Sequence, residues 1–70
     1  MKGIITRKDV EKGFGFITPD GVENTKNNNI FFYRDVLEGI TFEDIQEGVA
    51  VEFEVEPSDR GPRAVGVKRV

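Results

Sequence analysis

The segment KGFGFI, which begins at Lys12, places two phenylalanine rings two positions apart beside a basic residue. Because side chains in a β-strand alternate between its two faces, Phe14 and Phe16 share one face. In the later segment NIFFYR, the same alternation places Phe31 and Tyr33 on one face. Exposed aromatic rings in such a row can stack on nucleobases, since every base has a π-face.

The opposite faces of these two segments carry apolar residues that suit a core. If Ile17, Ile30 and Phe32 point inward, the four rings of the other face point outward together. An alternative is that the four rings themselves form the core, but a barrel of this size cannot bury both faces of each strand. With the rings outside, we expect Gly13 and Gly15 to keep the surface beside them open for a base or sugar.

Composition excludes several kinds of site. The 70 residues permit one domain, residues 1–70, and they include neither cysteine nor histidine and a single serine, Ser58. This excludes a disulfide framework, the usual zinc ligands and the usual nucleophile–base pairs. No apolar run approaches the ~20 residues that span a bilayer, and the N-terminus shows no signal-peptide pattern. We therefore expect a cytoplasmic protein that is not an enzyme and that uses no metal or cofactor.

The net charge of −3 is unevenly distributed along the chain. Residues 1–34 carry six bases and four acids, residues 35–56 carry eight acids and no base, and residues 57–70 carry four bases and one acid. If the two basic ends meet in the fold, one surface is positive while the whole chain stays acidic.

Short segments of strand pattern, separated by turn residues, predict a small all-β fold. The expected strands are about 2–8, 13–18, 30–33, 49–57 and 64–70, with a helical turn at 35–37. Five strands without a substantial helix favour a small five-stranded antiparallel barrel, because closure leaves no bare sheet edge.

The segment 49–57 has the clearest alternation. Its apolar residues, expected on the inner face, are Val49, Val51, Phe53 and Val55. The other face carries Glu52, Glu54 and Glu56. We expect these acids to point away from any ligand and to repel phosphate from the back of the barrel, rather than to bind a cation. In the last strand, Val65 and Val67 are expected to share a face.

Together, the segments KGFGFI, NIFFYRDVL, EGVAVEFEVE and RGPRAVGVKRV resemble the cold-shock domain family, in order and over essentially all 70 residues. KGFGFI matches the first ribonucleoprotein motif of that family in full, and IFFYR is similar to the second, usually V-F-V-H-F. The resemblance implies a five-stranded OB-type barrel that binds single-stranded RNA and DNA. It also implies a role as an RNA chaperone that regulates transcription or translation, including in the response to cold stress.

The resemblance further implies which residues contact nucleic acid. Phe14, Phe16 and Phe31 would be the central stacking rings. Lys12 would contact the backbone or a base edge. Tyr33 replaces the histidine of the family and can still stack.

Other implied contacts lie outside the two motifs or depart from the family pattern. Phe42, before the fourth strand, and Arg60, in DRGPR, match an aromatic and a basic position of the binding face. Arg7 and Lys8 stand where the family has a tryptophan and a phenylalanine, and Arg34 replaces the last aromatic of the second motif. Because a guanidinium stacks on bases and also pairs with phosphate, we expect Arg7 and Arg34 to contact nucleic acid, and we include Lys8 with them.

Two functions remain open from the sequence. The first is a monomeric module that binds single-stranded RNA or DNA, with no membrane or small-molecule partner. The alternative is a protein-interaction barrel that has lost nucleic-acid binding. The net acidity and the replaced aromatics support this alternative.

Overall fold

A computed structural model describes residues 1–25, 28–59 and 61–70. Within this part of the chain it contains five strands and one 3₁₀ turn, which lie close to the predicted ranges. The strands are β1 (Lys2–Asp9), β2 (Phe14–Pro19), β3 (Ile30–Tyr33), β4 (Ala50–Glu56) and β5 (Arg63–Arg69), and the 3₁₀ turn η1 is Arg34–Val36. In the part of the chain that the structure describes, no helix is long and apolar enough to cross a membrane.

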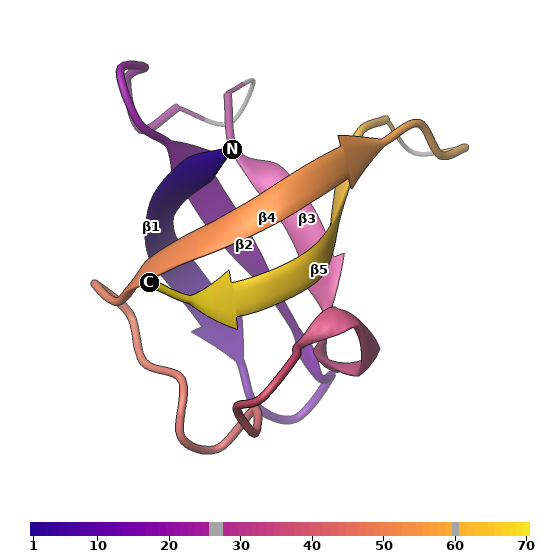
Figure 1. Ribbon diagram of the computed structural model, residues 1–70. Coiled ribbons are helices and arrows are strands. Elements are labelled where there is room, and N and C mark those ends of the chain that lie inside the picture. The colour runs from indigo at the N-terminus through magenta and orange to yellow at the C-terminus, as the bar shows by residue number, and fades with distance from the viewer. Residues whose placement is uncertain (26–27, 60) are drawn as a thin grey trace.

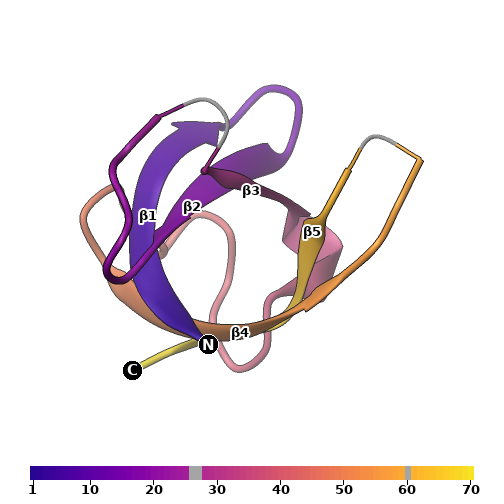
Figure 2. The ribbon, with the colours of Figure 1, turned by 90° about the horizontal axis from the view of Figure 1, so that it is seen from above.

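The strands close into a barrel in the order β1-β2-β3-β5-β4, which confirms the predicted fold class (Figures 1 and 2). Four of the pairings are antiparallel. The pairing of β3 with β5 differs from the expected antiparallel pattern, because these two strands run parallel and meet at Phe31 and Arg63. This parallel seam closes the ring and brings the start of β5 beside the middle of β3.

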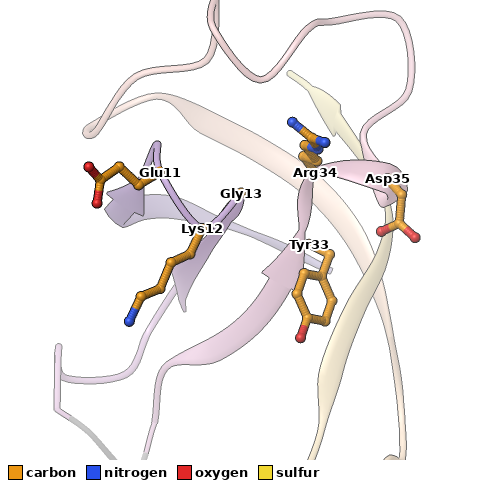
Figure 3. A pocket seen from close by; sticks show the side chains of 6 residues that line it. All are labelled: Glu11, Lys12, Gly13, Tyr33, Arg34 and Asp35. Carbon is orange, nitrogen blue, oxygen red and sulfur yellow. The ribbon is translucent and has the colours of Figure 1, made fainter.

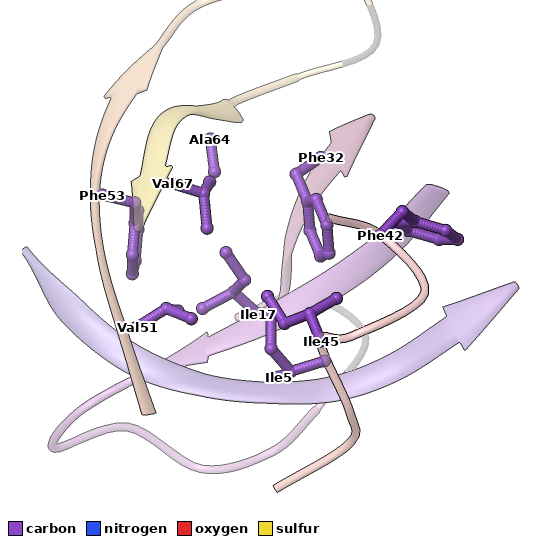
Figure 4. Packing of buried hydrophobic residues seen from close by; sticks show 9 residues of the cluster. All are labelled: Ile5, Ile17, Phe32, Phe42, Ile45, Val51, Phe53, Ala64 and Val67. Carbon is purple, nitrogen blue, oxygen red and sulfur yellow. The ribbon is translucent and has the colours of Figure 1, made fainter. Parts of the chain in front are cut away.

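The inside of the barrel is filled by apolar side chains from all five strands and from the segment between η1 and β4 (Figure 4). The buried hydrophobic residues of the described chain are Ile5, Ile17, Phe32, Phe42, Ile45, Val51, Phe53, Ala64 and Val67. The predicted inward positions Ile17 and Phe32 are fully buried, and Ile30 packs against the same cluster. The alternation in β2 and β3 therefore has the predicted sense.

Gly15 has a different role from the one expected. A Cβ atom at this position would lie 2.5 Å from the carbonyl oxygen of Arg7 and 2.7 Å from the Phe32 ring. Gly15 thus faces the core, where any side chain would collide with backbone and ring. It allows close packing of β1, β2 and Phe32 rather than keeping the outer surface open.

Two β-bulges change which residues face inward. On β5, Glu54 pairs with Val65 and Glu52 with Lys68, so β5 carries one extra residue at this point. As a result Ala64 and Val67 are buried, and the expectation that Val65 shares a face with Val67 is wrong.

At the end of β4, the expectation for Val55 is also wrong. Val51 and Phe53 are buried as predicted, but Val55 is 37% exposed. It lies near the end of the strand, opposite Ala64, beyond the part of β4 that faces the centre of the core.

The segment between η1 and β4 closes one end of the barrel below the strands in Figure 1. It contributes Phe42 and Ile45 to the core, while Leu37, Ile40 and Val49 pack against that core from the side. A barrel of 70 residues gains a substantial part of its small core from this irregular segment.

Candidate functional site

Four rings gather on the outer face of β2 and β3, as the sequence predicts. We call Phe14, Phe16, Phe31 and Tyr33 the aromatic cluster. Phe14 pairs with Tyr33 and Phe16 with Phe31 across the two strands. The ring centroids of Phe14 and Phe31 are 5.3 Å apart, those of Phe16 and Phe31 are 5.7 Å apart, and those of Phe31 and Tyr33 are 4.7 Å apart.

The rings of the cluster support one another. Phe31 meets Phe16 at an interplanar angle of 70° and Tyr33 at 89°, both edge-to-face arrangements that aromatic pairs favour. The three phenylalanines are therefore half-buried, by each other rather than by the core, and Tyr33 is 44% exposed. This packing limits the rotamers that the four rings can adopt. The binding of a flat ligand therefore costs less side-chain conformational entropy.

The cluster forms the floor of an open groove of about 700 Å³. The described residues that line it are Arg7, Phe14, Phe16, Phe31, Tyr33, Ser58, Asp59, Pro62 and Arg63. The groove is thus bounded by β1 on one side and by the β4–β5 connection and the start of β5 on the other.

Arg7 lies in this groove because of the second bulge. Ile5 pairs with Ile17, whereas Arg7 pairs with Phe16, so Thr6 is the extra residue on β1. A regular strand would place Arg7 on the inner face with Ile5. The bulge instead turns Arg7 to the outer face, beside Phe16.

A chain of hydrogen bonds ties this bulge to the loop before β3. The hydroxyls of Thr6 and Thr18 are hydrogen-bonded to each other. The Thr18 hydroxyl donates to the Oδ1 atom of Asn29 at 2.7 Å, and Asn29 donates through Nδ2 to Oδ1 of Asn24 at 3.0 Å. Side chains of β2 and of the loop before β3 thus support the bulge that directs Arg7 outward.

The opposite wall contains Arg63, a residue that the sequence analysis did not single out. Its guanidinium is held by Glu56, with Nη2 at 2.6 Å and Nε at 2.8 Å from the same carboxylate oxygen. Glu56 is not among the described residues that line the groove, but it lies beside this wall through its contact with Arg63. The sequence signal for Arg63 is weak, since only the parallel β3–β5 pairing places it beside Phe31.

Lys12 and Arg34 lie at the end of the aromatic cluster around a second, smaller hollow of about 420 Å³ (Figure 3). Tyr33 lines both this hollow and the main groove. The Arg34 side chain covers Gly13, whose φ of 73° favours glycine, with its Cδ 3.2 Å from where a Cβ would be. In Figure 3 Lys12 and Tyr33 extend the same way, while Arg34 points in the opposite direction.

Phe42 and Lys8 do not join the aromatic cluster. Phe42 is 6% exposed and belongs to the core, so the expectation that it offers a face for stacking is wrong. The Lys8 ammonium donates to the carbonyl oxygen of Ile45 at 2.6 Å and lies 4.9 Å from the Phe42 ring centroid. Lys8 thus covers the buried ring at the closed end of the barrel.

Two further expectations concern Arg60, as a contact to nucleic acid, and the acids of β4, as a solvated face that binds no cation. Arg60 lies outside the described residues. Glu52 approaches Lys68 at 3.8 Å on the outside of the β4–β5 pair. Among the described residues, no group of three or more acids is placed to hold a metal ion.

Comparison with known proteins places these features in context. The sequence model of the family described as "'Cold-shock' DNA-binding domain" matches residues 1–70. The chain is 36% identical to cold shock protein CspA of Staphylococcus aureus over 69 residues, which cover 99% of this chain and 97% of that protein. It is 36% identical to a cold shock-like protein of Thermotoga maritima (100% and 98% covered) and 37% identical to cold shock-like protein CspC of Escherichia coli (100% and 96% covered).

Proposed function

The chain belongs to the cold-shock domain family, and we propose that it binds single-stranded RNA or DNA on the aromatic cluster. Unpaired bases stack on the rings, and no covalent chemistry takes place. By holding bases unpaired, the protein acts in the cytoplasm as an RNA chaperone that regulates transcription or translation.

The observation that carries this proposal is the position of four rings on the outer face of two neighbouring strands. The core is already filled from the other face of the same strands, so burial does not explain the rings. Each base stacked on an aromatic side chain contributes about 1–3 kcal/mol, largely regardless of sequence. Single strands suit this surface because their bases can turn outward.

The basic residues around the cluster supply contacts to the sugar-phosphate backbone. Arg7 lies beside Phe16 in the groove, and Lys12 lies beyond Tyr33 at its end. Arg34 lines the same hollow as Lys12 but points the other way, so it would reach a strand that continues past Gly13. Arg60, at a basic position of the family's binding face, completes the proposed set. Few phosphates are neutralised by so few bases, so the affinity should fall only gently with salt, with a slope of about 0.7 per phosphate in a log–log plot.

Titration with oligothymidine and oligouridine, followed by tyrosine fluorescence, tests the proposal. Tyr33 is the only tyrosine and the chain has no tryptophan, so the signal reports directly on the cluster. We expect saturable binding at low salt, which Phe16→Ala weakens about 5- to 150-fold through the loss of one stacked base.

The matched control is Ile4→Ala, which shortens an exposed apolar side chain of β1 outside the groove. It should leave the affinity unchanged. A wild-type protein with intact far-UV circular dichroism but no oligonucleotide binding at low salt would refute the proposal and favour the protein-interaction barrel.

A further inference from the structure

One row of side chains crosses the outer face of the groove from wall to wall. Arg7 on β1 pairs with Phe16 on β2, Phe16 with Phe31 on β3, and Phe31 with Arg63 on β5. All four line the groove. Neighbouring strands lie about 4.8 Å apart, so the two arginines bracket a pair of rings across three strand spacings.

The two arginines differ in their surroundings. Within the described chain, the Arg7 side chain has no ion pair and no hydrogen bond, and the residue is exposed. Arg63 directs Nε and Nη2 to one oxygen of Glu56, at 2.8 and 2.6 Å. The Arg7 charge is therefore uncompensated, whereas Arg63 and Glu56 form a neutral pair.

This difference determines what each arginine can bind. An uncompensated guanidinium attracts phosphate and releases counterions when it binds. Phosphate is less favourable beside Arg63, because the Glu56 carboxylate would repel it and the described lining of that wall also includes Asp59. The Nη1–Nη2 edge of Arg63 is nevertheless unused by Glu56 and still carries two donors in one plane.

Two coplanar donors match two adjacent acceptors on a base. Guanine offers such a pair in O6 and N7, whereas the corresponding edges of the other bases combine an acceptor with a donor or a methyl group or present only a donor. Cytosine has a comparable pair, N3 and O2, on its Watson–Crick edge, so oligothymidines with a single cytosine are the comparison for the guanine series. In a single strand this edge of the base is accessible. Phe31, next to Arg63 in the row, provides a ring on which that base can stack.

We propose that Arg63, oriented by Glu56, reads the O6/N7 edge of one guanine in the bound strand, while Arg7 contacts phosphate on the opposite wall. The inference rests on the proposed single-strand binding and adds a base preference to it. In this arrangement Glu56 is a positioning residue, because it fixes the guanidinium plane without touching the ligand.

The test uses short oligothymidines in which a single guanine occupies each position in turn. At one position, guanine should raise the affinity of the wild-type protein about 5- to 150-fold over thymine. Replacing that guanine by 7-deazaguanine, which lacks the N7 acceptor, should remove most of the gain.

Variants separate the two arginines. Arg63→Gln and Arg63→Lys should both abolish the guanine preference, because neither side chain presents two coplanar N–H donors as a guanidinium does. The salt dependence of binding to plain oligothymidine should change little in either variant. Arg7→Gln should weaken all oligonucleotides alike and lower the log–log salt slope by about 0.7. Glu56→Ala should reduce the guanine preference and steepen the salt slope, since it releases the charge of Arg63.

The matched control is Lys68→Gln, which removes a base from the other ion pair between β4 and β5, away from the groove. It should alter neither the preference nor the slope. If the wild-type protein binds oligothymidine but shows no guanine preference at any position, or if Arg63→Gln lowers the slope as Arg7→Gln does, the inference is refuted while single-strand binding stands. Absence of any binding would refute both.

Discussion

The two faces of the β2–β3 pair carry similar apolar side chains, but these side chains have different surroundings and different roles. On the inner face, Phe32 is fully buried and packs so closely that Gly15 opposite it admits no side chain. On the outer face, Phe31 and its neighbouring rings are half-buried by one another and border an open groove. A core ring, Phe32, and a proposed ligand-binding ring, Phe31, are thus consecutive residues.

This comparison indicates that folding and binding depend on different residues within the same strands. Removing a buried aromatic side chain loses its transfer free energy and leaves a cavity, whereas a ring on an open groove leaves no enclosed cavity. Inner substitutions should therefore change the free energy of unfolding most, and outer substitutions the affinity for single strands.

The largest effect is expected on the inner face. Phe32→Ala should lower the free energy of unfolding by about 3–5 kcal/mol, through lost burial and a residual cavity. For a domain of this size, a loss of that magnitude removes most or all of the stability. Urea unfolding followed by circular dichroism measures it, and a loss below about 1 kcal/mol would contradict the assigned core.

The matched outer substitution should show the opposite balance. Phe31→Ala should weaken binding to oligothymidine about 5- to 150-fold, since Phe31 contacts three other rings and lies at the centre of the cluster. Its cost in unfolding free energy should be clearly smaller than that of Phe32→Ala. Equal losses of stability in the two variants would remove the distinction between the faces.

A smaller effect is expected at the bulge that turns β1 from the inner to the outer face. Thr6→Val keeps the side-chain shape but removes the hydroxyl that bonds Thr18, so stability should fall by about 1 kcal/mol. Because the bulge directs Arg7 into the groove, Arg7→Gln should then weaken binding less in the Thr6→Val background than in the wild-type protein. Additive effects in this double-mutant cycle would show that the hydroxyl does not position Arg7.

The smallest effect is expected on a surface that belongs to neither face. Lys68 and Glu52 are exposed and their charged atoms are 3.8 Å apart. Lys68→Gln should change the free energy of unfolding by less than about 0.5 kcal/mol, because exposed ion pairs contribute little. A loss above 1 kcal/mol in thermal or urea unfolding would show that this pair has a structural role.

The alternation of residues predicted much of this architecture. In β2 and β3 the period of two places Ile17 and Phe32 inside and the four rings outside, because short strands between turns leave little freedom of register. The number of strands and the closed barrel also follow from the pattern of turns and from the need to cover sheet edges.

Where an extra residue or an irregular segment intervenes, alternation failed. The bulge at Thr6 and the bulge in β5 depend on how the barrel closes, so neither the outward turn of Arg7 nor the separation of Val65 from Val67 could be read locally. Phe42 lies in a segment without a regular period, and its burial depends on long-range packing.

The place of Arg63 in the groove could not be predicted from the sequence for a related reason. It stands at the start of a strand, 32 positions after the residue beside which the parallel seam places it, Phe31. No spacing rule connects the two residues, because their contact depends on the closure of the whole barrel. Its partner Glu56, which was expected on a solvated back face, lies next to this wall because it pairs with Arg63 across β4 and β5.

The most direct test of the central claim is a backbone amide chemical-shift titration of the ¹⁵N-labelled protein with oligothymidine. We expect the largest shifts in residues 14–16 and 31–33 and on the flanking walls at Arg7 and Arg63. Little change is expected at Glu54 and Lys68 on the far side of the β4–β5 pair. Shifts confined to that far side, or none at saturating oligonucleotide with the fold intact, would contradict the claim that the outer rings bind single strands.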